Sequence, residues 1–172
     1  SIGKNVSISN ALIGDNVFLS DGTKIGQDGF GFAYDETHSP IKIFHIGRVI
    51  IQNGVSIGTN CTLDKGSFND TVIGENTYID NLVHIAHNVI IGNGTIIAAQ
   101  CGFAGSVFVG KNCLFGGQCG IAGHINIGNN VTVAAKSGVT KNIKDNSVVA
   151  GFPAIDIKLW RKNIVNDRNN RR

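Results

Sequence analysis

Three histidines and one glycine have the types and spacing that suit chemistry: His84, His87, His124 and Gly105. An imidazole takes up or releases a proton near neutral pH, so it can act as a general base toward an amine or a hydroxyl. A glycine has no side chain, so a carbonyl oxygen can approach its backbone N–H and be stabilised there as an oxyanion. A base placed beside such an amide suits acyl transfer, provided that the fold brings the two residues together.

A repeat of six residues over residues 73–144 defines the structural elements that must bring these residues together. Every hexapeptide has a large apolar residue at its first position, from Ile73 to Val139, and Gly, Ala, Asp or Thr at its second. A period of six does not fit the 3.6-residue turn of an α-helix, but it does fit a short strand followed by a bend. The sequence therefore predicts an all-β fold, a parallel β-helix of hexapeptide repeats with the apolar positions stacked inside.

The coil length predicts which residues become neighbours. Three hexapeptides make one three-sided coil, so residues that are three hexapeptides apart should stack. His87 and Gly105 are then vertical neighbours about 5 Å apart, and His124 lies about 10 Å higher near the same corner. His84 precedes the same interior column. We expect all three histidines to lie outside the core.

The repeat has two interruptions and ends before the C-terminus. Residues 27–44 contain four aromatic residues and several turn formers, which predicts an insertion that leaves the coil at one corner, as a lid or as a contact surface. A shorter interruption covers residues 67–71. We expect a β-helix domain over residues 1–150 and a C-terminal extension over residues 151–172, with a short helix around residues 159–165.

Composition limits the class of protein. Charged residues make up 16% of the chain and there are 23 glycines, which favours a sheet-rich folded domain over disorder. The sequence has no run of about 18 apolar residues and no visible signal peptide, so we expect no integral membrane segment. Cysteines that are expected to stay reduced favour a cytoplasmic location. The sequence also has no methionine, so we expect it to begin inside a longer protein.

The cysteines and the charge distribution add two expectations. All four cysteines occupy the fifth, inward-leaning hexapeptide position and should be buried, reduced thiols: Cys61, Cys101, Cys113 and Cys119. Residues 158–172 have six basic side chains and one acidic one, a net charge of +5 within a chain of +3. Such a tail is either a solvated end or attracts an acidic partner. No nucleic-acid-binding motif accompanies it, so we expect no nucleic acid partner.

Two other interpretations use the same scaffold. The histidines can be zinc ligands with an open position for water, as in the trimeric gamma-class carbonic anhydrases. Their histidine spacing differs from the spacing here, and the insertion and the tail would have no role, so we expect no metal. The chain can also be a non-catalytic trimeric scaffold, although the presence of His87, Gly105 and His124 argues against this.

Longer motifs point to a family. These are DGFGFA (28–33), HIGRVII (45–51), DTVIGENTYIDNLVHIAHNVIIG (70–92), FAGS (103–106), AGHINIG (122–128), and GFPA with LWRK (151–162). The hexapeptides resemble the left-handed β-helix acyltransferases, and this resemblance alone supplies the hand of the helix. The combination of motifs, which extends over nearly the whole chain, resembles the UDP-3-O-(3-hydroxyacyl)glucosamine N-acyltransferases of lipid A biosynthesis.

The resemblance implies an enzyme that moves a 3-hydroxyacyl chain onto the 2-amino group of UDP-3-O-acylglucosamine. The donor is the phosphopantetheine thioester of acyl carrier protein, and no further cofactor and no metal take part. In these terms His87 is the general base, Gly105 supplies the oxyanion amide, and His124 positions the substrates. The family is a homotrimer with active sites in the grooves between subunits.

Four more residues are candidates for substrate binding. His84 directly precedes the IAH sequence, while Asp80 and Asn81 belong to the IDN sequence before it. Asp80 and Asn81 are also the candidates for orienting His87. Lys141, together with the basic tail, would meet the acidic carrier protein.

The chain departs from the family pattern in two ways. Family members have a separate N-terminal domain that helps to bind uridine, and no matching segment is present here, which leaves nucleotide binding open. The sequence HIAH, with His84, is similar to the sister family that O-acylates UDP-N-acetylglucosamine, although an Asp typically follows the histidine there and Asn88 follows it here. The O-acyltransferase is therefore the alternative function. The length of the acyl chain stays open, with Gly138 and Thr140 near the upper end of the groove.

Overall fold

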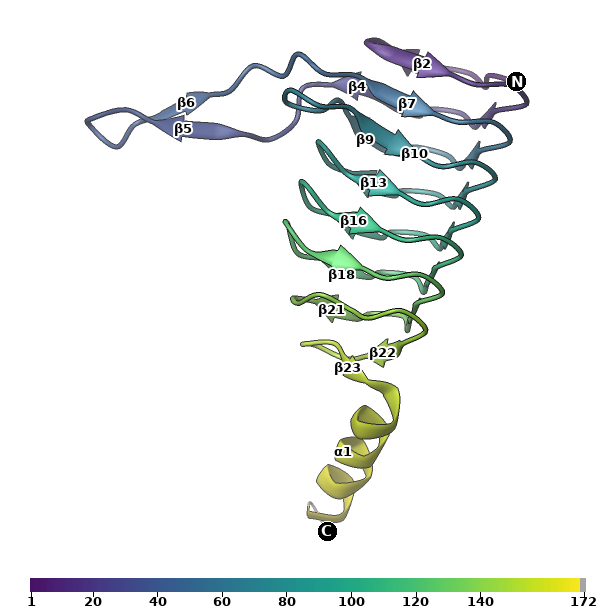
Figure 1. The fold of residues 1–172 in the computed structure, drawn as a ribbon, viewed down its shortest axis with the longest axis vertical. Helices are drawn as coiled ribbons and strands as arrows, with labels where there is room; N and C mark the ends of the chain where they lie inside the picture. The colour runs from purple at the N-terminus through teal and green to yellow at the C-terminus, as the bar shows by residue number, and fades with distance from the viewer. Residues whose placement is uncertain (171–172) are drawn as a thin grey trace.

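The computed structural model describes the backbone of residues 1–170 and the side chains of residues 1–166. The chain winds as a left-handed parallel β-helix whose coils stack along one axis (Figure 1). Within these residues one helix, α1 (Ile157–Asn170), continues beyond the last coil. The predicted all-β class and the predicted hexapeptide β-helix are both confirmed.

The strands of the coils form three sheets that follow the three sides of the coil, and β5 (Phe32–Tyr34) and β6 (Pro40–Lys42) form a separate two-stranded sheet. The first sheet consists of β1 (Ser7–Ile8), β4 (Lys24–Gln27), β9 (Thr62–Asp64), β12 (His84–Ile85), β15 (Gly102–Phe103), β18 (Gly120–Ile121) and β21 (Gly138–Val139). The second consists of β2 (Ala11–Ile13), β7 (Val49–Ile51), β10 (Thr71–Ile73), β13 (Ile90–Ile91), β16 (Phe108–Val109) and β19 (Asn126–Ile127). The third consists of β3 (Phe18–Leu19), β8 (Ser56–Ile57), β11 (Tyr78–Ile79), β14 (Ile96–Ile97), β17 (Leu114–Phe115), β20 (Thr132–Val133), β22 (Val148–Ala150) and β23 (Ile155–Asp156).

The register of these sheets gives the length of each coil. His84 pairs with Gly102, which follows it by three hexapeptides, so the uninterrupted repeat has the predicted coil. Ala11 pairs with Val49, and the chain between them contains one ordinary coil together with the longer insertion. Val49 pairs in turn with Thr71, which is only slightly more than one coil away, so the second interruption is short. Both interruptions therefore leave the stacking of the coils intact.

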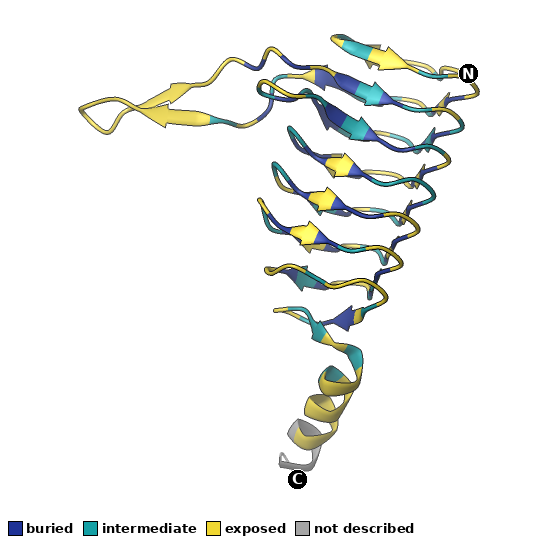
Figure 2. Cartoon of the chain, in the orientation of Figure 1, coloured by how far each residue is buried: buried dark blue, intermediate teal, exposed yellow. Residues whose placement is uncertain are grey.

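The longer insertion leaves the β-helix as a hairpin. Its strands β5 (Phe32–Tyr34) and β6 (Pro40–Lys42) are antiparallel and project away from the coils (Figure 1). The carboxylate of Asp35 accepts hydrogen bonds from the backbone N–H groups of Thr37 and Ser39, which closes the turn at the tip. The hairpin is almost entirely exposed (Figure 2).

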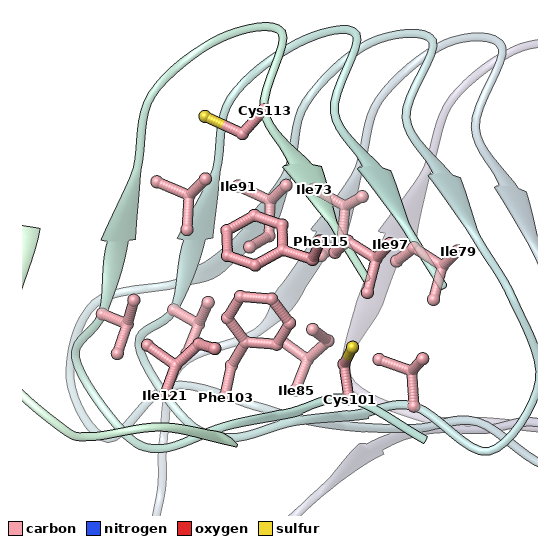
Figure 3. Packing of buried hydrophobic residues seen from close by; sticks show 14 of the residues in the cluster. Ile73, Ile79, Ile85, Ile91, Ile97, Cys101, Phe103, Cys113, Phe115 and Ile121 are labelled. Atoms are coloured by element: carbon pink, nitrogen blue, oxygen red, sulfur yellow. The ribbon is translucent and has the colours of Figure 1, made fainter. Parts of the chain in front are cut away.

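The core is a stack of apolar side chains inside the coils. The first positions of the hexapeptides point inward, and the rings of Phe103 and Phe115 meet edge to face with centroids 5.0 Å apart (Figure 3). The four cysteines are free and buried in the same core, as predicted. Burial raises the pKa of the Cys61 and Cys113 thiols, which keeps them protonated and unreactive.

The C-terminal helix is longer than the sequence predicted, because it extends from Ile157 to Asn170 rather than from about residue 159 to about residue 165. Asp156 is its N-cap: the carboxylate accepts hydrogen bonds from the N–H groups of Lys158 and Leu159, at 2.9 and 3.4 Å. The side chains of residues 167–172, which include three of the six basic residues of the tail, lie outside the described part. Within the part that is described, no helix is both long and apolar enough to cross a membrane.

The alternation of inward and outward positions makes a prediction about stability. Phe115 is fully buried, whereas Leu114 on the same strand is 45% exposed. We expect Phe115→Ala to lower the free energy of unfolding by about 3–5 kcal/mol, because it leaves a cavity in the aromatic stack. Leu114→Ala, the matched control, should change it by about 1 kcal/mol or less. Urea titration followed by circular dichroism measures both, and equal losses would contradict the inward placement of Phe115.

Candidate active site

A groove with a volume of about 580 Å³ runs along the outer face of the first sheet. Its floor is a column of glycines, Gly102, Gly120 and Gly138, which pair with one another from coil to coil. Phe30, from the base of the insertion, lines the groove near the coil of His84 and His87, and Phe152 lines it near Gly138. The groove is mostly apolar, with its polar side chains concentrated at the Phe30 end.

His87 and Gly105 lie together on this groove. A Cβ atom built on Gly105 would stand 2.6 Å from Cε1 and Nε2 of His87, so the imidazole occupies the space that a side chain would need. The Ser106 N–H donates to the carbonyl of His87 at 3.0 Å, which places the two corners one coil apart. The structure thus brings the two residues together as the coil of three hexapeptides predicts. Among the described residues, the Gly105 N–H has no hydrogen-bond acceptor, so it is free to bind a ligand.

Asn88 orients the imidazole. Its amide is held in one orientation, because Nδ2 donates to the carbonyl of Asn69 at 2.9 Å and Oδ1 accepts from the N–H of Ser67 at 3.0 Å. Nδ1 of His87 lies 3.0 Å from the same Oδ1 and must therefore donate to it. In the neutral ring the lone pair is then on Nε2, the nitrogen beside Gly105. This is the tautomer that a general base at this position requires.

Asp80 and Asn81 do not orient His87, contrary to the sequence-based expectation. They lie at the preceding corner of the coil, where Asp80 accepts from the N–H of Asn81 and Asn81 accepts from the N–H of Thr59, both at 2.7 Å. One hexapeptide corresponds to one side of the triangular coil, so closeness in sequence places them on a different edge. Their proposed role in substrate binding stays a prediction.

His124 and Lys141 lie beside the groove rather than in its lining. The N–H of His124 donates to the carbonyl of Gly105 at 3.1 Å, but His124 stacks on Ser106 and is exposed, with φ of 59°. Lys141 is exposed and follows Thr140, which lines the upper part of the groove. The structure thus places both residues at the rim.

His84 lines the groove and pairs with a carboxylate that the sequence analysis did not single out. Its Nδ1 lies 2.8 Å from the hydroxyl of Thr62, and its Nε2 lies 3.7 Å from Oδ2 of Asp64. Burial raises the pKa of the Asp64 carboxyl, while the imidazoles around it act in the opposite direction. Asp64 occupies the second position of its hexapeptide, where most repeats have a small residue. This departure from the pattern was the signal that could have identified it.

His45 was also not identified from the sequence. It is 3% exposed, and its ring lies edge-on to that of His87 with centroids 5.1 Å apart. Its position in the HIGRVII motif was the available signal, but only the path of the insertion shows that it reaches His87. Among the residues that the structure describes, no three or more His, Cys, Asp or Glu side chains are grouped so as to hold a metal ion.

The fold and the repeat define the class of this protein, a hexapeptide-repeat protein with a left-handed β-helix. Residues 70–105 match the family model for the bacterial transferase hexapeptide (six repeats). Residues 47–68 and 106–141 match the model for the hexapeptide repeat of succinyl-transferase. A crystal structure of UDP-N-acetylglucosamine O-acyltransferase from Moraxella catarrhalis has a TM-score of 0.70 at 21% identity, covering 94% of this chain and 68% of that one. At this identity the similarity concerns the fold alone.

Curated relatives show a more specific resemblance than the fold does. Two proteins named UDP-3-O-acylglucosamine N-acyltransferase, from Sinorhizobium medicae and Rhizobium meliloti, are 61% identical over 83 residues and 56% identical over 89. The alignments cover 48% and 52% of this chain, but only 23% and 25% of the relatives. The chain therefore spans about a quarter of the length of the curated relatives it matches. The resemblance to these N-acyltransferases that the motifs indicated is confirmed over about half of the chain.

The contact between His87 and Gly105 makes a prediction about the imidazole. We expect Gly105→Ala to displace the His87 ring, because the new methyl group would lie 2.6 Å from its Cε1 and Nε2 atoms. Gly120→Ala is the matched control, since a Cβ there meets nothing within 4 Å. The ring signals of His87 in NMR spectra should shift in the first variant only. An unchanged His87 spectrum in Gly105→Ala would show that the two residues are not in contact.

Proposed function

We propose that this chain is the acyl-transferring part of a UDP-3-O-acylglucosamine N-acyltransferase, with His87 as its general base. The observation that carries this proposal is the placement of Nε2 of His87 beside Gly105 on an apolar groove, where the Gly105 N–H has no acceptor among the residues that the structure describes. The similarity to relatives with this name supports the choice of reaction. The acceptor would be the 2-amino group of UDP-3-O-acylglucosamine, and the donor a 3-hydroxyacyl thioester of acyl carrier protein.

The chemistry follows from the two groups. Nε2 of His87 takes a proton from the amine as the amine nitrogen attacks the thioester carbonyl carbon. The carbonyl oxygen becomes an oxyanion, which accepts a hydrogen bond from the Gly105 N–H. The intermediate then collapses, the carbon–sulfur bond breaks, and the imidazolium returns its proton to the departing thiolate. Asn88 keeps the Nδ1–H in place throughout, so that only Nε2 exchanges a proton.

The groove is suited to the acyl chain. Its glycine floor has no side chains over three coils, and apolar atoms dominate its surface, so an extended hydrocarbon chain can lie along it and lose its contact with water. The polar end at His84 and Asp64 is close to His87 and would face the sugar. The thioester would then sit between the two ends, over Gly105.

Partners and assembly are part of the same proposal. Tyr78, Ile96 and Leu114 stack on the outer face of the third sheet, and each is about half exposed. Burial of such a stripe against another copy of the chain would support the proposed homotrimer. Lys141 at the rim of the groove and the basic residues of α1 would attract the acidic carrier protein. The proposed setting is the cytoplasm, where the carrier protein and the nucleotide sugar would be found.

The O-acyltransferase remains the second candidate, because the HIAH sequence places His84 on the groove beside His87. A hydroxyl acceptor needs a base as much as an amine does. Competition between UDP-3-O-acylglucosamine and UDP-N-acetylglucosamine for the same acyl donor separates the two functions. Preferential acylation of the hydroxyl would replace the first proposal by the second.

Removal of the base is the direct test of the mechanism. We expect His87→Ala to lower kcat by about 10²–10⁴-fold, because proton transfer then has to occur through water. His124→Ala should cause a smaller loss, because His124 lies at the rim. Both variants should keep the wild-type melting temperature to within a few degrees, since neither side chain is in the core. A His87→Ala enzyme of wild-type rate, or equal losses in the two variants, would contradict the assigned roles.

Obstruction of the groove tests the acyl site. Gly120 has open space above it, so Gly120→Leu should fold normally and fill the middle of the groove. We expect KM for a long-chain acyl donor to rise at least about tenfold, because the added side chain displaces the hydrocarbon. Asn126→Leu, at an exposed outward position on the second sheet, is the control and should leave KM unchanged. Equal KM values in both variants would place the acyl chain elsewhere.

A further inference from the structure

His45 is a buried histidine with an unusual set of contacts. It follows the insertion, and its Nδ1 lies 3.0 Å from the carbonyl of Ile43. A carbonyl oxygen only accepts, so Nδ1 of His45 donates this hydrogen bond. Within the described residues, Nε2 has no hydrogen-bond partner although it is buried. A buried polar atom left unpaired destabilises the fold, so an apolar side chain would suit the packing better unless the ring has another role.

The His45 ring packs against His87, the proposed general base. The rings of His45 and His87 are inclined by 61° with centroids 5.1 Å apart, an edge-to-face arrangement. Gly29, at the start of the insertion, lies next to both rings. A Cβ atom there would lie 2.9 Å from Nε2 of His45 and also 2.9 Å from Cβ and Cδ2 of His87. Gly31 is similarly close to His45, since its Cβ would stand 3.2 Å from Cε1. The glycines thus let the insertion backbone approach both rings.

These contacts complete the surroundings of the His87 imidazole. Asn88 fixes the Nδ1 side by a hydrogen bond, and Gly105 lies against the Cε1–Nε2 edge. The insertion backbone at Gly29 comes close to the Cβ and Cδ2 atoms, and the His45 ring meets the imidazole edge to face.

We propose that His45 is a positioning residue, which the base of the insertion presses against the His87 imidazole to hold Nε2 beside Gly105. The insertion hairpin then contributes to the active site through its base rather than its tip. The proposal rests on the proposed function only for its effect on turnover, because the orientation of the ring can be measured without substrate.

The test compares three replacements of His45 in this chain. His45→Ala removes the ring, and His45→Gln removes the ring but keeps a donor for the carbonyl of Ile43. His45→Phe keeps the ring and loses the donor. Glu36→Ala, an exposed change at the tip of the hairpin, is the control. NMR of the histidine ring protons reports the environment of His87, and steady-state kinetics separates kcat from KM.

We expect His45→Ala and His45→Gln to move the His87 ring signals toward those of a free imidazole and to lower kcat by about 10- to 100-fold, with KM unchanged. His45→Phe should restore both the ring signals and most of kcat. Wild-type ring signals in the Ala and Gln variants would overturn the proposal, and so would equal losses in Phe and Gln. If His45→Ala does not fold, the Gln and Phe pair decides. If the wild-type chain transfers no acyl group, the proposed function fails, while the NMR comparison still decides the role of His45.

Discussion

The backbone hydrogen bonding between successive coils is the constraint on which the rest of the structure depends. Each short strand of the regular coils pairs with the strand three hexapeptides later, and this register fixes the position of every side chain along the axis. The apolar stack inside the coils supplies the stability, but it tolerates exchange among residues of similar size. The register does not tolerate a shift, because a shift of one residue would turn the inward positions outward. His87 and Gly105 meet because this register holds.

The same constraint explains what the sequence could predict. The hexapeptide period is uninterrupted from Ile73 to Val139, so the coil, the three inward cysteines within this run and the pairing of His87 with Gly105 all follow from counting. The surroundings of His87 do not follow from counting. Asn88 acts through the orientation of its amide, which depends on contacts with the coil before it. His45 is placed by an insertion that has no period. Asp80 was wrongly considered as a partner of the imidazole because it is close in sequence, whereas a coil brings distant residues together.

The two insertions have different consequences for the site. The longer one places Phe30 at the end of the groove, and it places Gly29 and His45 against His87. The proposed base therefore belongs to a regular coil, but irregular backbone lies next to it. The shorter one contains Ser67 and Asn69, which hold the amide of Asn88. Both interruptions of the repeat therefore meet at the same corner. The regular coils set the spacing between base and amide, and the interruptions set the orientation of the base.

The stacked floor of the groove also has a consequence for evolution. From the coil of His84 to the coil of Gly138 there are three steps of one coil each, which corresponds to about 14 Å at the usual strand spacing. Phe152 lies against Gly138 and marks the upper end of this distance. Gain or loss of one whole coil between Gly105 and Phe152 would alter the span by a single step and leave the chemistry at His87 untouched. Under the proposed function, a chain built in this way can acquire a preference for a longer or shorter acyl chain by duplicating or deleting a segment, while the proposed base stays where it is.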